Sequence, residues 1–161
     1  MKHTISVLVE NHFGVLARVS GLFSSRGYNI DSLCVGETDD SSISRMTVVA
    51  RGDDRVLGQI VKQLEKLVDV IEVIDLTQES YVERELAMVK VGVNGTRRSE
   101  VIEIASIFRA KVVDMSADAM VVEVTGTEDK IRAFVDMVRP FGIQELVRTG
   151  RIAIARSANS V

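Results

Sequence analysis

The chain alternates between two hydrophobic periods, and these periods predict its elements. In TISVLVE (4–10) every second residue is apolar, which is typical of a half-buried strand. In VLARVSGLFSSRGY (15–28) apolar residues recur every three or four positions, which predicts an amphipathic helix. The rest of the first half is predicted as strands 30–38 and 43–51, a helix 54–68 that Asp53 caps, and a strand 70–78. The predicted order is βαββαβ.

The second half repeats this order about 80 residues later. Its predicted elements are a strand 85–93, a helix 99–110 capped by Ser99, strands 111–116 and 119–126, a helix 128–139 that Pro140 ends, and a strand 143–155 interrupted at Gly150. The polar segment 77–85 is predicted to be a linker. Each half has the split βαβ pattern. We therefore expect an α+β protein of two tandem ferredoxin-like βαββαβ domains, residues 3–78 and 79–161.

Composition excludes several classes of function. The 161 residues are 46% hydrophobic and 27% charged, which is typical of a globular protein, and their net charge is −3. No basic surface is predicted, and aromatic residues make up 4%, so nucleic acid is not expected as a partner. No apolar run is long enough to span a membrane. The start of the chain does not resemble a signal peptide, and Cys34 is the single cysteine, so a cytoplasmic location is expected.

The sequence shows no catalytic constellation. Its two histidines, His3 and His12, are not accompanied by acidic residues at metal-ligand spacing, so no metal site is predicted. The acidic pairs Asp39-Asp40 and Asp53-Asp54 lie at turns, where aspartate is favoured for local hydrogen bonding. The sequence contains neither of the glycine-rich phosphate-binding motifs, G-x-x-x-x-G-K-[ST] and G-x-G-x-x-G. The chain is not expected to be an enzyme by itself.

The loop ENHFG (10–14) offers a different kind of chemistry. If the helix begins at Val15, its N-cap is Gly14, which has no side chain to satisfy the first amides of the helix. Such an open helix end favours a small carboxylate, and Asn11 could hold a ligand ammonium or donate to a carboxylate. The alternative is that water satisfies the amides. The spacing alone leaves both open, and the second half, where Ser99 is the expected cap, is not expected to contain such a site.

Asn29 follows the other end of the same helix. It is either a turn residue or part of a polar site with Asn11. Within one βαββαβ unit the two asparagines would lie at opposite ends of the helix, roughly 20 Å apart at about 1.5 Å per residue. They can therefore meet only across an interface between subunits.

The segment ISVLVENHFGVLARVSGLFSSRGYNIDSL, followed by SRMT, strongly resembles the small, regulatory subunit of acetolactate synthase (acetohydroxyacid synthase). ENHFGVLARV is similar to that family's version of the ACT-domain strand-loop-helix signature. The resemblance is specific over residues 3–76 and looser beyond them. It identifies residues 3–78 as an ACT domain.

The resemblance implies a regulatory role. The catalytic partner would be the large acetolactate synthase subunit with thiamine diphosphate, Mg²⁺ and FAD, and this chain would activate it and confer feedback inhibition by valine or a related branched-chain amino acid. Such ACT domains form homodimers that bind the effector at their interface. The residues that the resemblance assigns to the effector are Asn11, Gly14, Val15 and Leu16 of one chain and Asn29 and Ile30 of the other.

Two other functions are compatible with the pattern. One is a stand-alone ACT-type amino-acid sensor with another client enzyme. The other is a ferredoxin-like hydrolase of the acylphosphatase type, which the lack of a glycine-rich phosphate-binding turn disfavours.

Overall fold

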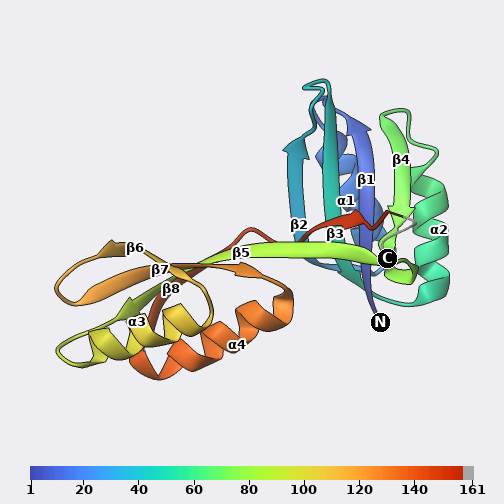
Figure 1. Cartoon of the computed structure of the whole chain (residues 1–161). Helices are drawn as coiled ribbons and strands as arrows, with labels where there is room; N and C mark the ends of the chain where they lie inside the picture. The colour runs from blue at the N-terminus through green and yellow to red at the C-terminus, as the bar shows by residue number, and fades with distance from the viewer. Residues whose placement is uncertain (158–161) are drawn as a thin grey trace. The chain divides into compact units, whose positions relative to one another are not determined.

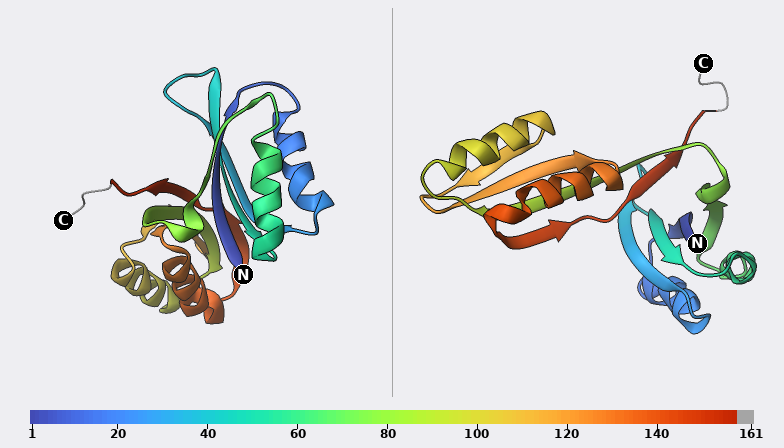
Figure 2. Two further views of the ribbon diagram at one scale, coloured as in Figure 1. Left: turned by 90° about the vertical axis from the view of Figure 1, so that its right-hand side faces the viewer. Right: turned by 90° about the horizontal axis from the view of Figure 1, so that it is seen from below.

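The computed structural model describes residues 1–157 and forms two compact units (Figure 1). Of the described residues, the first unit comprises Met1–Val82 together with 151–157, and the second comprises Glu83–Gly150. Each unit is an antiparallel sheet with two helices on one face (Figure 2). The predicted α+β class, with two ferredoxin-like units, is confirmed.

The first unit has the predicted βαββαβ order. Its elements are β1 (Lys2–Glu10), α1 (Val15–Ser25), β2 (Asn29–Glu37), β3 (Ile43–Arg51), α2 (Asp54–Leu64) and β4 (Val70–Asp75), followed by the short 3₁₀ helix η1 (Leu76–Gln78). The strands are arranged β2-β3-β1-β4, so β2 and β4 are the two edges of the sheet. Asp53 caps α2 as predicted, since its side chain accepts a hydrogen bond from the amide of Arg55.

The period of β1 explains how the first core forms. Ile5, Val7 and Val9 point to one face of the sheet and are at most 1% exposed. The stripe of α1 places Val19 and Phe23 in the same core cluster, and α2 adds its own apolar stripe. His3 lies one step further along the same strand face and is also buried.

The second unit is built in the same way. Its elements are β5 (Tyr81–Gly92), α3 (Arg97–Ile107), β6 (Lys111–Met115), β7 (Ala119–Gly126), α4 (Glu128–Val138), the 3₁₀ helix η2 (Arg139–Phe141) and β8 (Ile143–Arg148), with strand order β6-β7-β5-β8. Pro140 lies within η2, directly after α4, where it prevents the α-helix from continuing.

Two expectations for the second half were wrong in detail. Residues 81–85 are not linker, because β5 already begins at Tyr81. Helix α3 begins at Arg97 with Thr96 as its N-cap, so Ser99 is inside the helix and does not cap it. The interruption predicted at Gly150 is confirmed: the segment 143–155 forms two strands, β8 and β9 (Ile152–Ala155), with Gly150 between them at a φ of 81°.

Residues 151–157 belong to the first unit. Strand β9 pairs with β5, whose first residues, Tyr81 and Val82, are part of that unit. The guanidinium of Arg151 donates to the Thr4 hydroxyl (2.9 Å), and its amide donates to the Ser32 hydroxyl (3.5 Å). Residues 151–157 were expected in the second domain, but these polar contacts join them to the first.

An ion pair with one buried partner lies at one end of the second sheet. The Arg148 guanidinium donates to both oxygens of Glu85, at 2.6 and 2.9 Å, while the Glu85 side chain is only 6% exposed. These hydrogen bonds raise the pKa of Arg148. We expect Arg148→Ala to lower the free energy of unfolding by about 1 to 2 kcal/mol, because a buried carboxylate loses its partner. Urea denaturation measures this, and an Arg132→Ala variant, at an exposed position of α4, serves as the control.

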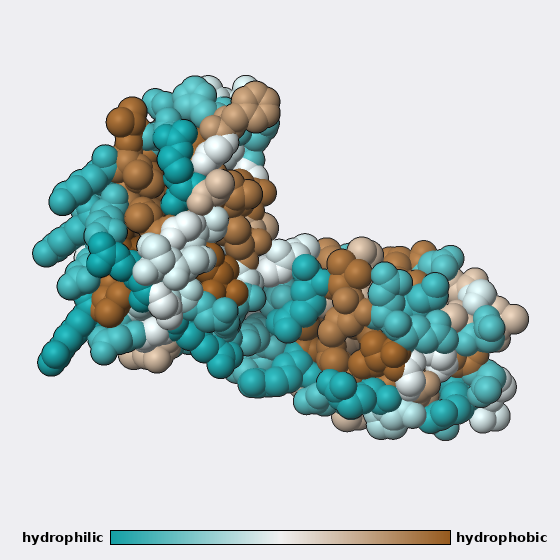
Figure 3. Space-filling model, turned by 180° about the vertical axis from the view of Figure 1, so that it is seen from behind, coloured by the Kyte–Doolittle hydropathy of each residue, from teal (hydrophilic) through white to brown (hydrophobic). Residues whose placement is uncertain are grey.

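The free face of the second sheet is partly apolar. Met88 of β5 and Val147 of β8 are direct neighbours across the sheet and are 41% and 47% exposed. Figure 3 shows hydrophobic side chains gathered over the second unit on the side opposite to that of Figure 1. No helix within residues 1–157 is long and apolar enough to cross a membrane.

Candidate functional site

The loop between β1 and α1 leaves the helix N-terminus open. Gly14 is the N-cap with φ 82° and ψ −7°, a left-handed conformation that favours glycine, and no side chain caps the helix. The predicted N-cap is therefore confirmed. The side chain of Val15 is buried, so this residue offers only its backbone amide at the helix end. The side chain of Leu16 is 44% exposed. An uncapped helix end of this kind, with its first amides and the positive end of its dipole, can accept a small anion.

Arg18 adds a full positive charge to this helix end. A Cβ atom placed on Gly14 would lie 3.9 Å from Arg18 Nη2, and the other guanidinium nitrogen of Arg18 pairs with Asp69 at 2.8 Å. The Arg18 amide donates to the Gly14 carbonyl in the first turn of the helix. Sequence reasoning did not select Arg18, although a position four residues after the cap lies on the same helix face.

Asn11 faces the hairpin between β2 and β3. Its Nδ2 donates to the Ser41 carbonyl at 3.0 Å and to Glu37 Oε1 at 3.3 Å. Because the amide nitrogen is engaged, the carbonyl oxygen is the atom that Asn11 offers to a ligand. That oxygen, beside the Glu37 carboxylate, suits an ammonium group rather than a carboxylate.

The same loop forms an open pocket. Its volume is about 340 Å³, and Asn11, His12 and Phe13 line it. Phe13 is fully exposed, which is unusual for a large aromatic side chain and was not noted from the sequence. The pocket lies next to the uncapped end of α1, so helix amides without a side-chain cap, the Asn11 oxygen and the apolar Phe13 ring occur together.

Asn29 and Ile30 are not part of this cluster in a single chain. Asn29 is the first residue of β2 and pairs with Arg51, whereas Asn11 contacts Glu37, the last residue of the same strand. A strand of this length spans about 26 Å at about 3.3 Å per residue. The structure thus separates the two asparagines, as the sequence predicted for one chain. The Asn29 side chain donates to Asp31 instead, at 3.4 Å.

Two family models match this chain. Residues 5–72 match the AHAS small subunit-like ACT domain, and residues 84–157 match the small subunit of acetolactate synthase. The chain belongs to the acetolactate synthase small-subunit family. Its first unit therefore contains an ACT domain, and the open helix end lies within it.

Relatives of this family are similar over nearly the whole chain. A "Probable acetolactate synthase small subunit" from Archaeoglobus fulgidus is 54% identical over 97% of this chain and 98% of its own length. The acetolactate synthase small subunit of Aquifex aeolicus is 53% identical over 96% of this chain and 81% of its own length. The crystal structure of the acetolactate synthase small subunit from Thermotoga maritima superposes with a TM-score of 0.88 at 37% identity, covering 98% of both chains. The family of regulatory small subunits is thus shown by sequence and by fold.

The fold of the ACT domain also assembles one group of metal-ligating side chains that sequence spacing did not reveal. Within residues 1–157, ligand atoms of Glu10, His12 and Asp69 lie within 4.8 Å of one another. Two existing contacts already use these groups: His12 Nε2 is 3.0 Å from Glu10 Oε2, and Asp69 pairs with Arg18. The Arg18 guanidinium opposes a second cation at Asp69. The group therefore has a structural explanation without a metal ion.

Proposed function

We propose that this chain activates the catalytic subunit of acetolactate synthase and makes it sensitive to feedback inhibition by valine or a related branched-chain amino acid. The observation that carries the proposal is the left-handed, uncapped Gly14 at the start of α1. In a family of regulatory small subunits, an open helix end in the ACT domain is the natural place for the carboxylate of an effector amino acid.

The proposed site forms between two chains through β2. This strand is an edge of the first sheet, so its outer backbone groups are available for pairing. If the β2 strands of two chains pair antiparallel about a two-fold axis at Leu33, the partner's Asn29 faces Glu37, since each lies four residues from Leu33. Glu37 contacts Asn11, so this homodimer completes the site that one chain leaves divided.

Each part of an amino acid then has a partner. Its carboxylate binds the amides of Val15 and Leu16, with Arg18 adding positive charge. Its ammonium binds the oxygen of Asn11, beside Glu37 and the partner's Asn29. The apolar side chain contacts Leu16 and Val35, which are 44% and 42% exposed, and the partner's Ile30. These contacts favour a compact branched aliphatic side chain.

The reaction itself belongs to the catalytic partner. There we place thiamine diphosphate, Mg²⁺ and FAD, and we assign no cofactor to this chain. Because the effector contacts two chains at once, its binding favours one arrangement of these chains over others. The catalytic subunit that is bound to them responds to this change. A coupling free energy of about 1–3 kcal/mol between the two sites is typical and is sufficient to change activity severalfold.

Reconstitution tests this proposal. We expect the purified chain to increase the activity of an acetolactate synthase catalytic subunit and valine to reduce that activity only when the chain is present. Activation without any amino-acid inhibition would refute the effector site. Valine binding without activation would instead indicate a stand-alone ACT-type sensor with another client enzyme.

Asn29→Ala tests whether the site is shared between chains. We expect the concentration of valine needed for half-inhibition to rise about tenfold, because a hydrogen bond to a charged ammonium group is worth about 1.5 kcal/mol or more. An Asn94→Ala variant in the second unit should leave the inhibition curve unchanged. If Asn11→Ala weakens inhibition and Asn29→Ala does not, the site lies within one chain and the β2 dimer is wrong.

A further inference from the structure

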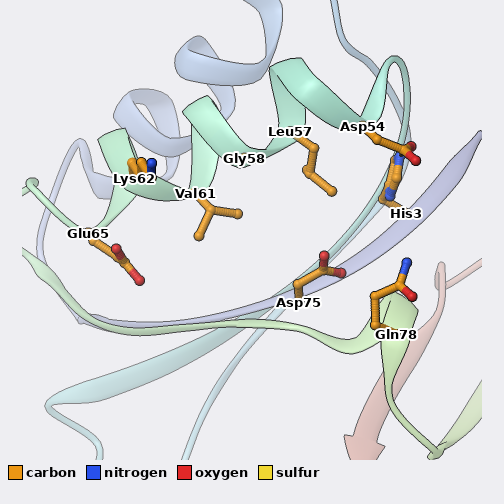
Figure 4. A pocket seen from close by; sticks show the side chains of 9 residues that line it. All are labelled: His3, Asp54, Leu57, Gly58, Val61, Lys62, Glu65, Asp75 and Gln78. Carbon is orange, nitrogen blue, oxygen red and sulfur yellow. The ribbon is translucent and has the colours of Figure 1, made fainter.

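A second pocket lies at the opposite edge of the first sheet from β2. It has a volume of about 480 Å³ and opens between α2, the end of β4 and η1 (Figure 4). Strand β4 is the other edge of the sheet, so this pocket is separate from the effector site proposed above. All of its lining residues belong to the first unit.

His3 is the unexplained group in this pocket. Its side chain is 2% exposed, and neither ring nitrogen has a hydrogen-bond partner. Nε2 lies 3.1 Å from Asp54 Oδ1, but the two groups are not aligned for a hydrogen bond. An unsatisfied buried polar group is destabilising, and such groups normally contact protein, water or a ligand. The imidazole is therefore available to a molecule that enters the pocket.

The charges of the lining favour a cation. Asp54, Glu65 and Asp75 contribute three carboxylates, against the single lysine, Lys62. Asp75 Oδ1 accepts a hydrogen bond from the Thr77 amide at 3.0 Å, which fixes its side chain. Figure 4 shows the Asp75 carboxylate and the Gln78 amide directed toward the space beneath α2, near His3. These oxygen atoms and the imidazole can accept hydrogen bonds from an ammonium group.

The middle of the pocket is apolar. Leu57 and Val61 line it on α2, and between them Gly58 adds no side chain. A Cβ atom placed on Gly58 would contact nothing within 4 Å, so the space beside the helix is open there. Along α2, Asp54 and Glu65 are separated by about 16 Å, at about 1.5 Å per residue. The pocket thus has acidic groups at both ends, and between them an apolar surface against which methylene groups can pack.

We propose that this pocket binds an aliphatic diamine, one ammonium group at His3, Asp54 and Asp75 and the other toward Glu65. The methylene chain of the diamine lies against Leu57 and Val61. The proposal does not depend on the amino-acid site, because its residues come from the β4 edge of the sheet. Its binding can therefore be measured on the isolated full chain, without the catalytic subunit.

The test is a titration of the ¹⁵N-labelled full chain with 1,8-diaminooctane, whose chain is long enough to reach from one acidic end of the pocket to the other, followed by NMR and by calorimetry. We expect saturable shifts at the His3 ring nitrogens and at the amides of α2 and η1. Octylamine, which has the same chain but lacks the second ammonium group, should bind about tenfold more weakly, since one charged contact is worth about 1.4 kcal/mol. Acetate should cause no saturable shift.

Variants separate binding from folding. Gly58→Met should block the pocket and abolish binding, whereas Gly58→Ala should fold and bind, because the extra methyl group meets no neighbour. Asp75→Asn should weaken binding about tenfold through loss of one charged contact, and Glu72→Gln, at an exposed position of β4 outside the lining, should not. The proposal is overturned if the His3 nitrogens do not respond, so that the pocket holds water only. It is also overturned if acetate saturates the same signals or if Glu72→Gln weakens binding as much as Asp75→Asn.

Discussion

Gly14→Asp is expected to leave activation of the catalytic subunit intact and to abolish inhibition by valine. The new carboxylate would lie at the open end of α1, where the proposed site holds the carboxylate of the effector. Two negative charges about 4 Å apart repel by about 4 kcal/mol at an effective dielectric constant near 20. Even if Arg18 offsets part of this repulsion, half-inhibition should require at least about tenfold more valine.

The matched control for this variant is Gly14→Asn. Gly14 has φ 82°, so any side chain there adopts a left-handed conformation, which asparagine and aspartate tolerate better than most residues. The two variants therefore share the backbone cost and differ in charge. Asn should retain a weaker but measurable inhibition. Equal loss in both variants would show that backbone strain, not charge, is responsible, and unchanged inhibition in Gly14→Asp would remove Gly14 from the site.

Gly52→Ala should strongly destabilise the first unit. A Cβ atom at Gly52 would lie 2.5 Å from Cζ of Tyr28, whose ring is only 4% exposed. The ring has no room to move, because it packs near Phe23 and its hydroxyl donates to the Asp53 carbonyl. Overpacking of this kind costs about 1–3 kcal/mol, and we expect the upper end.

Gly21→Ala provides the comparison in the same unit. Gly21 lies in α1, and an added Cβ atom would contact nothing within 4 Å. This substitution should stabilise the chain by about 0.5–1 kcal/mol, because alanine is the better helix former. Thermal and urea unfolding of the two variants should therefore change in opposite directions. A Gly52→Ala protein as stable as the unsubstituted chain would show that Tyr28 is not confined.

Local periodicity accounts for the elements that the sequence predicted well. The alternation of Ile5, Val7 and Val9 and the stripe of Val19 and Phe23 each identify a buried face directly, and the structure confirms both. Residues 81–85 were misread, because polarity alone does not distinguish a linker from the partly exposed first residues of a strand such as β5. The attachment of β9 to the first unit depends on the long-range contacts of Arg151 with Thr4 and Ser32, which no local pattern encodes.

In the candidate site, too, local patterns identify some residues, whereas others are found only from long-range contacts. Gly14 could be selected from sequence, since a missing cap is a local property of one helix. Glu37 could not, because it reaches Asn11 only through the pairing of β2 with β3. From the sequence His3 lies just before the first predicted strand, and only the structure shows that its side chain is buried and that its nitrogens have no hydrogen-bond partner.

The return of the chain at Arg151 makes the second unit an insertion rather than an appended domain. The chain leaves the first unit after Val82 and comes back at Arg151, and Leu86 and Thr149, near the two crossings, are hydrogen-bonded to each other. A shortened ACT domain that stops at residue 82 would lack the partners of the Thr4 and Ser32 hydroxyls. To isolate the first unit, residues 83–150 should therefore be removed and Val82 joined to Arg151. The shortened protein then keeps both segments of the chain that belong to this unit.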